Sequence, residues 1–206
     1  MGELVDGIIA GFRQTTLLEF IATTMGVASV TFSMMRRILV YPTGIVSVSI
    51  YIYLTATNKL YADAGVNFYY LIMSIYGWYN WTTGEMDASQ IKVAVNNHKE
   101  NLISLMILVV SFITLSQVLS HFTDSDVPYW DAATTSFAIV GMWLMAQKKL
   151  ENWIAWIITD LLSVPLYYHK GLVFTSLQFL IFTILATWGF FIWRGILNRN
   201  TNSAVG

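Results

Sequence analysis

The sequence predicts an all-α integral membrane protein in which seven transmembrane helices form two parallel three-helix bundles and one linking helix, a 3+1+3 arrangement. Two features of the composition predict the membrane class: 56% of the residues are hydrophobic and only 11% are charged, whereas soluble domains usually carry about 25% charged residues. An internal repeat predicts the arrangement, because matched halves in an apolar chain are typical of transporters built from two similar bundles.

Seven segments have the apolar length that a spanning helix needs, which is about 20 residues. In chain order they are Thr16–Met35, Ile38–Thr57, Val66–Thr83, Leu102–His121, Tyr129–Gln147, Asn152–Tyr168 and Leu172–Arg194. The turns between them are short, except for the polar segment Gly84–Asn101 and the acidic segment Phe122–Pro128.

The two halves share one order of landmarks: an acidic residue, an apolar span, a basic pair, a second span, a short turn, a third span and Gly-x-x-x-Trp. The offset is the 112 residues that separate Glu19 from Asp131. The other matched landmarks are Arg36-Arg37 with Lys148-Lys149, Leu54 with Leu166, Leu60 with Leu172, Gly77 with Gly189, and Trp81 with Trp193. Two three-helix bundles point the same way only if an odd number of helices joins them. The span Leu102–His121, which has no counterpart, is therefore expected to be the single linking helix.

The repeat divides the chain into five regions. They are an amino-terminal segment (1–15), the first bundle (16–83), a loop with the linking helix (84–128), the second bundle (129–195) and a carboxyl-terminal tail (196–206). In the first region Ile8, Ile9 and Phe12 lie on one side, which is the pattern of a helix in the membrane interface.

The basic residues predict the orientation, because cytoplasmic loops carry an excess of Lys and Arg. One side of the predicted membrane domain holds eight of the 11 basic residues: Arg36, Arg37, Lys92, Lys99, Lys148, Lys149, Arg194 and Arg199. The other side holds Arg13, Lys59 and Lys170. The amino terminus is therefore expected outside and the carboxyl terminus in the cytoplasm.

Three acidic residues fall within the spans, where ionisable groups are costly and informative. Glu19 and Asp131 open their helices, where a carboxylate interacts favourably with the helix dipole. Asp160 lies near the middle of Asn152–Tyr168, and no Lys or Arg lies inside any span to neutralise it. It must therefore face a wet cavity, accept several hydrogen bonds, be protonated or meet a cation.

The neighbours of Asp160 indicate a substrate site. Trp153, Trp156 and Asp160 follow spacings of three and four residues, which place them on one helical face. Two aromatic faces beside a carboxylate suit a flat cationic or polar ring. The alternative is a tryptophan face packed against other helices.

Polar side chains on other spans could complete this site. Asn67, Tyr70 and Ser74 form a stripe on the third span, which either lines a cavity or bonds to another helix. The last span supplies a comparable amide in Gln178. The hydroxyls of Ser47 and Thr159 occupy repeat-matched positions in the second span of each half.

The composition disfavours other classes of protein. A net charge of −1 without a basic stripe gives no surface for nucleic acid. The chain has no Cys, and its three His lie near the ends of the predicted spans, so no metal, cofactor or nucleophile–base pair is expected. A scaffold or receptor is a poor fit, because large soluble loops are absent.

Two long segments resemble the PnuC vitamin-transporter family. They are Tyr41–Trp81, with its LYAD and YGWYxW elements, and Glu151–Leu172, with its WxxW and LYxxKGL elements. The resemblance extends from about Thr16 to Gly195, and the family is similar in architecture to SWEET sugar carriers. It implies facilitated uptake of nicotinamide riboside, an NAD precursor, across a bacterial inner membrane, and a homo-oligomer that is a trimer.

The resemblance also implies site residues. Trp153, Trp156 and Tyr76 would contact the substrate ring, and Asp160 and Asn67 would supply polar contacts. Several members have Asn at the position of Asp160, Gln at that of Asn67 and Asn at that of Ser47. The same family includes thiamine and riboflavin carriers, so a different vitamin is an alternative substrate. A proton-coupled carrier with Asp160 as the relay is a second alternative to passive transport.

Overall fold

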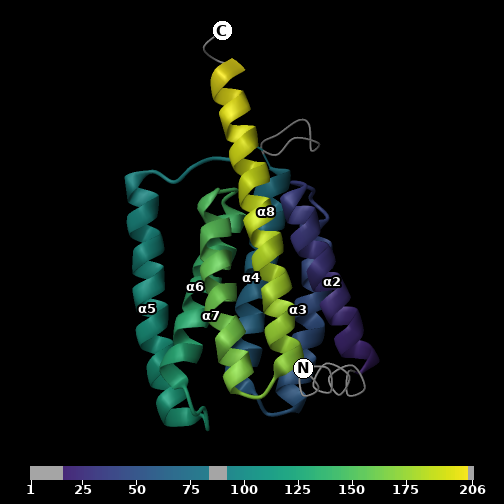
Figure 1. The fold of residues 1–206 in the computed structure, drawn as a ribbon, viewed down its shortest axis with the longest axis vertical. Coiled ribbons are helices and arrows are strands. Elements are labelled where there is room, and N and C mark those ends of the chain that lie inside the picture. Colours follow the sequence, from purple (N-terminus) through teal and green to yellow (C-terminus); the bar gives the residue numbers. More distant parts are fainter. Residues whose placement is uncertain (1–15, 84–91, 204–206) are drawn as a thin grey trace.

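The computed structural model describes residues 16–83 and 92–203, and these form seven α-helices without a strand. The helices, labelled in Figure 1, are α2 (Leu17–Met34), α3 (Val40–Thr57), α4 (Tyr61–Thr82), α5 (His98–Phe122), α6 (Pro128–Ala146), α7 (Glu151–His169) and α8 (Val173–Ser203). The all-α, seven-helix class expected from the sequence is confirmed.

The helices group as three, one and three. α2, α3 and α4 pack in chain order, as do α6, α7 and α8, and the contacts of α4 with α6 and of α8 with α2 close these six helices into a ring. α5 stands outside the ring against α6, at the edge of the molecule opposite α2 (Figure 1). We call α2–α4 the first half and α6–α8 the second half.

Four helices are long and apolar enough to cross a membrane by themselves: α2, α3, α5 and the Thr175–Arg199 part of α8. The other three carry more polar residues. In α6 and α7 many of these, including Thr134, Ser136, Asn152 and Asp160, are buried. Their polar side chains face other helices instead of lipid, which is how less apolar helices are accommodated in a membrane bundle.

Helix ends differ from the expected spans in three places. α4 starts at Tyr61 and α5 at His98, a turn earlier than expected, and α8 continues to Ser203, beyond the expected end at Arg194. The early start of α5 has a clear cause: Asn97 accepts a hydrogen bond from the Glu100 backbone N–H, and the Glu100 side chain accepts one from that of Asn97. Such a capping box satisfies two free N–H groups at a helix start. The interfacial helix expected near Ile8 lies outside the described residues.

The turns of the two halves match residue for residue at the repeat offset. Arg36 and Lys148 have φ of 55° and 60° in the α2–α3 and α6–α7 turns, and Lys59 and Gly171 have φ of 61° and 74° in the α3–α4 and α7–α8 turns. The backbone hydrogen bonds that close these turns are also equivalent. We call the end with the Arg36 and Lys148 turns the basic end, and the opposite end, with Asp63 and Asp131, the acidic end.

Four aromatic side chains close the ring of helices at the basic end. Tyr41 and Trp81 of the first half pack edge to face with ring centroids 5.1 Å apart, and their repeat partners Trp153 and Trp193 do the same at 5.6 Å. Trp81 and Trp193 meet between the halves at 6.3 Å. All four are at most 2% exposed.

Two of these rings also donate hydrogen bonds across the halves. Trp81 Nε1 donates to the Met145 carbonyl at 3.1 Å, and Trp193 Nε1 donates to the Ser33 carbonyl at 3.2 Å. The two bonds are related by the same repeat, so at this end each half donates one hydrogen bond to the other.

Candidate substrate-binding site

Asp160 is a buried carboxyl group near the middle of α7. It is only 4% exposed, and its carboxylate makes no hydrogen bond or ion pair with the residues that the structure describes. An isolated carboxylate is costly to bury, so this position is suited to a ligand that supplies positive charge or hydrogen-bond donors.

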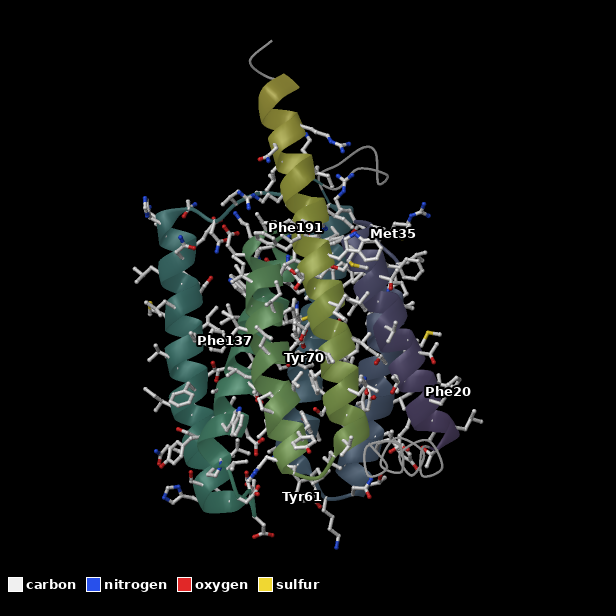
Figure 2. The ribbon with its side chains drawn as sticks, in the orientation of Figure 1. Phe20, Met35, Tyr61, Tyr70, Phe137 and Phe191 are labelled. Carbon is white, nitrogen blue, oxygen red and sulfur yellow. The ribbon has the colours of Figure 1, made fainter. Side chains whose placement is uncertain are left out.

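Two aromatic rings flank Asp160, one from each half. Trp156 lies one turn earlier on α7, and Tyr70 comes from α4 with its ring centroid 6.5 Å from that of Trp156. Tyr70 also interacts electrostatically with Asp160. Figure 2 shows Tyr70 at mid-height in the assembly, which is the level expected for a carrier site.

Sequence reasoning placed Tyr70 on a polar stripe but did not select it for the site. Its repeat partner is Phe182, which lacks a hydroxyl, so the repeat gave no signal for it. Only the packing of α4 and α6 in the ring brings this side chain to the α7 face.

The two predicted hydroxyls differ in their availability. Ser47 is buried and donates to the Ala22 carbonyl of α2 at 2.8 Å. Thr159 is equally buried, but its Oγ1 has no partner among the described residues. Thr159 therefore retains hydrogen-bonding capacity next to Asp160, whereas Ser47 joins two helices of the first half.

The two predicted amides are half-buried. Asn67 Nδ2 donates to the Asp63 carbonyl, one turn earlier on its own helix, at 2.9 Å. Its side-chain oxygen is not used in that bond. Gln178 lies in α8 on the second half, half-buried.

Two of the predicted ring contacts are separated from the group around Asp160. Tyr76 stacks on Trp143 with centroids 6.4 Å apart and accepts a hydrogen bond from Gln147 Nε2 at 2.6 Å. Trp143 and Gln147 line a small hollow beside α5, on the outside of the ring of helices. Trp153 belongs to the aromatic cluster at the basic end, about 10 Å along α7 from Asp160. Its Nε1 is buried without a hydrogen-bond partner in the described part of the chain.

Close helix packing fixes the orientation of Trp156. An ideal Cβ on Gly141 of α6 would lie 3.0 Å from the Trp156 ring, so a larger residue at position 141 would displace it. The first half has Gly44 at the position equivalent to Trp156 and Val48 at that of Asp160. The carboxylate and the Trp156 ring therefore come from the second half, whereas the Tyr70 ring comes from the first half.

The described residues of this group are one carboxylate, a free hydroxyl and aromatic rings from both halves. No group of three or more His, Asp or Glu that could hold a metal occurs among the residues described. A flat cation would pair with the carboxylate and stack on the rings.

Seven helices in the described part of the chain, four of them apolar enough to span a membrane, form two repeated halves with buried polar groups between them, which is the architecture of a multi-pass membrane transporter. The chain belongs to the nicotinamide mononucleotide transporter family, whose model matches residues 16–195.

Curated relatives span most of the chain. The nicotinamide riboside transporter PnuC of Escherichia coli is 23% identical over 209 residues, covering 89% of this chain and 87% of the relative. PnuC of Neisseria mucosa is 25% identical over 96% of this chain and 79% of its own length. The riboflavin/roseoflavin transporter RibM of Streptomyces davaonensis is 25% identical over 85% of this chain and 83% of its own length.

A solved structure has the same fold. The crystal structure of the vitamin B3 transporter PnuC matches with a TM-score of 0.71 and 24% identity, over 96% of this chain and 89% of that one. At this identity the likeness concerns the fold, and the substrate has to be argued from the residues of this chain.

Proposed function

We propose that this protein carries nicotinamide riboside across the bacterial inner membrane by facilitated diffusion, with alternating access to a site at Asp160. One observation carries the proposal: a buried carboxylate without a protein partner lies beside Trp156 and Tyr70. The pyridinium ring of nicotinamide riboside is flat and positively charged, so one ligand satisfies both features. Thr159 would donate to or accept from a ribose hydroxyl.

The site favours the riboside over the mononucleotide. The mononucleotide adds a phosphate, which needs Arg, Lys or several backbone N–H groups. Asp160 has no ion pair with a basic residue in the described chain, and a phosphate close to its unpaired carboxylate would be repelled. A neutral flavin, the substrate named for RibM, would leave that charge unpaired.

The remaining predicted contacts extend the same site. Asn67 and Gln178 would reach substrate hydroxyls from α4 and α8, and Trp153 and Tyr76 would approach the ring after a change in helix packing. Ser47 would act through its bond to α2. The chemistry is transport alone, since the site offers no nucleophile–base pair.

The same proposal includes orientation and assembly. The basic end faces the cytoplasm, because it carries most of the Lys and Arg, and the carboxyl terminus follows it. The protein forms a homo-oligomer, a trimer, in which α5 is exposed for contact because it packs on α6 outside the ring. Thiamine, another flat cation, is the second candidate substrate, since Asp160 does not discriminate between the two.

Uptake into proteoliposomes tests the function. Labelled nicotinamide riboside should equilibrate across the membrane without accumulating, and unlabelled riboside should compete better than the mononucleotide, thiamine or riboflavin. Accumulation driven by an imposed pH gradient would show that transport is proton-coupled and not passive. Competition by thiamine alone would show that thiamine, and not nicotinamide riboside, is the substrate.

A further inference from the structure

Two charged residues of the sequence motifs, Asp63 and Lys170, have no role in the substrate site, and both lie at the acidic end. Lys170 of the LYxxKGL element donates from Nζ to both carboxylate oxygens of Asp131, at 2.6 and 2.8 Å. Ser125 Oγ adds a third hydrogen bond to Asp131 at 2.6 Å. Asp63 of the LYAD element lies within electrostatic range of both Lys170 and Asp131 but forms no ion pair in the described chain.

This cluster lies across the boundary between the halves. Asp63 is in the first turn of α4, in the first half, whereas Asp131 opens α6 and Lys170 ends α7, both in the second half. A change of partner by Lys170, from Asp131 to Asp63, would therefore convert a contact within one half into a contact between halves.

The repeat shows that the turn at this end does not need the charge of Lys170. The first-half equivalents of Lys170 and Asp131 are Asn58 and Glu19. Asn58 bonds to the Leu54 carbonyl of its own helix, and Glu19 forms a capping box with Thr16. The turn next to Asn58 nevertheless closes with the same backbone hydrogen bonds as the turn next to Lys170.

The two ends of the molecule are held differently. At the basic end, hydrogen bonds from Trp81, Asn80 and Trp193 join the halves. Among the residues that the structure describes, no hydrogen bond joins the halves at the acidic end; the nearest runs from Tyr69 to the Ile139 carbonyl. In the described residues the hydrogen bonds between the halves therefore lie away from the acidic end.

A line of interacting side chains leads inward from this end. Tyr167 interacts electrostatically with Asp63 and Asp131, and Tyr70 interacts with both Tyr167 and Asp160. The ion cluster therefore lies at the outer end of the line of groups that leads to the substrate site.

We propose that Asp63 and Lys170 form the acidic-end gate of the transport cycle: Lys170 binds Asp131 while this end is open and bridges to Asp63 when the halves close over the substrate. The ion pair between Lys170 and Asp131 can break and re-form repeatedly, because their side chains are 24% and 19% exposed and partly solvated ion pairs are weak. This role rests on the proposed transport function.

The absence of Cys from the chain permits a direct test by cross-linking. The double variant Asp63→Cys with Lys170→Cys is reconstituted and treated with a short bifunctional methanethiosulfonate, which joins the two thiols through disulfides that a reductant cleaves. The matched control is Asp131→Cys with Lys170→Cys, which also lacks Lys170 but joins two positions within the second half. Uptake is measured before treatment, after treatment and after reduction.

We expect cross-linking to abolish the uptake that the Asp63 pair shows before treatment, reduction to restore it, and the uptake that the Asp131 pair shows before treatment to be unchanged by either reagent. The gate proposal is wrong if the cross-linked Asp63 pair still transports, if its thiols are not joined, or if cross-linking blocks the control pair equally. Failure of the transport proposal is recognised separately, as absent uptake by the unsubstituted protein before any reagent is added.

Discussion

Asp160 and Val48 occupy equivalent positions in the two halves, but only Asp160 carries charge. The same asymmetry separates Trp156 from Gly44 and Tyr70 from Phe182. Asp160 and Trp156 belong to the second half and Tyr70 to the first, so each half contributes side chains that the other does not repeat. At the scale of residues, recognition depends on the few positions where the repeat is broken.

The charge of Asp160 should account for cation binding. We expect Asp160→Asn to weaken nicotinamide riboside roughly 10- to 100-fold, because an interaction with a charged partner contributes about 1.5–3 kcal/mol. Binding of the reduced dihydro riboside, which has the same shape without the ring charge, should change little. Calorimetry on purified protein measures both, with Glu19→Gln as the control outside the site. Equal losses of affinity for the two ligands would show that Asp160 does not recognise the positive charge of the ring.

Within each half, two helices pack closely at a glycine. Ideal Cβ atoms on Gly77 and Gly189 would lie 2.5 Å from Tyr41 and 2.7 Å from Trp153. At the scale of elements these two positions allow α3 to pack on α4 and α7 on α8 at the level of the aromatic cluster. The same cluster supplies the reciprocal bonds of Trp81 and Trp193.

Alanine at either glycine should destabilise the protein by about 1–3 kcal/mol, because the added methyl group overpacks a buried aromatic contact. Matched controls lie on the same helices: Gly65 in α4 and Gly195 in α8 have no atoms within 4 Å of an ideal Cβ. Thermal unfolding in detergent should show a lower midpoint for Gly77→Ala and Gly189→Ala than for Gly65→Ala and Gly195→Ala. Unchanged midpoints for the first two would mean that the aromatic rings shift without cost.

The whole molecule is a pseudo-symmetric ring with unequal ends. Aromatic packing and hydrogen bonds join the halves at the basic end, while the acidic end carries the Asp63, Asp131 and Lys170 cluster. Alternating access requires that the bonds at one end break as those at the other end form. In the gate proposed above, a joined basic end belongs to the stage at which the site communicates with the acidic end.

Labelling of single cysteines tests how this ring is oriented in the membrane. Lys59 and Arg37 are both exposed, in turns at opposite ends of the first half. In intact cells a membrane-impermeant maleimide should label Lys59→Cys, and it should label Arg37→Cys only after the membrane is opened. The positive-inside rule is the physical reason. The reverse pattern would place the amino terminus in the cytoplasm.

The sequence by itself determined the class, the number of helices and the repeat. These depend on local quantities, namely apolar length, charged turns and landmark spacing, and a chain that enters lipid must satisfy its backbone hydrogen bonds within each helix. It also identified Asp160, because a lone charge in an apolar span is conspicuous without any knowledge of its neighbours.

Only the tertiary structure decided which side chains meet. It joined Tyr70 to Trp156 and Asp160, placed Trp153 in the cluster at the basic end, directed Tyr76 outward to Trp143, and brought Asp63 towards Lys170. These relations depend on helix rotation and on the order of helices around the ring. Residue periodicity gives the face that a side chain occupies on its own helix, but it does not give the helix that this face contacts.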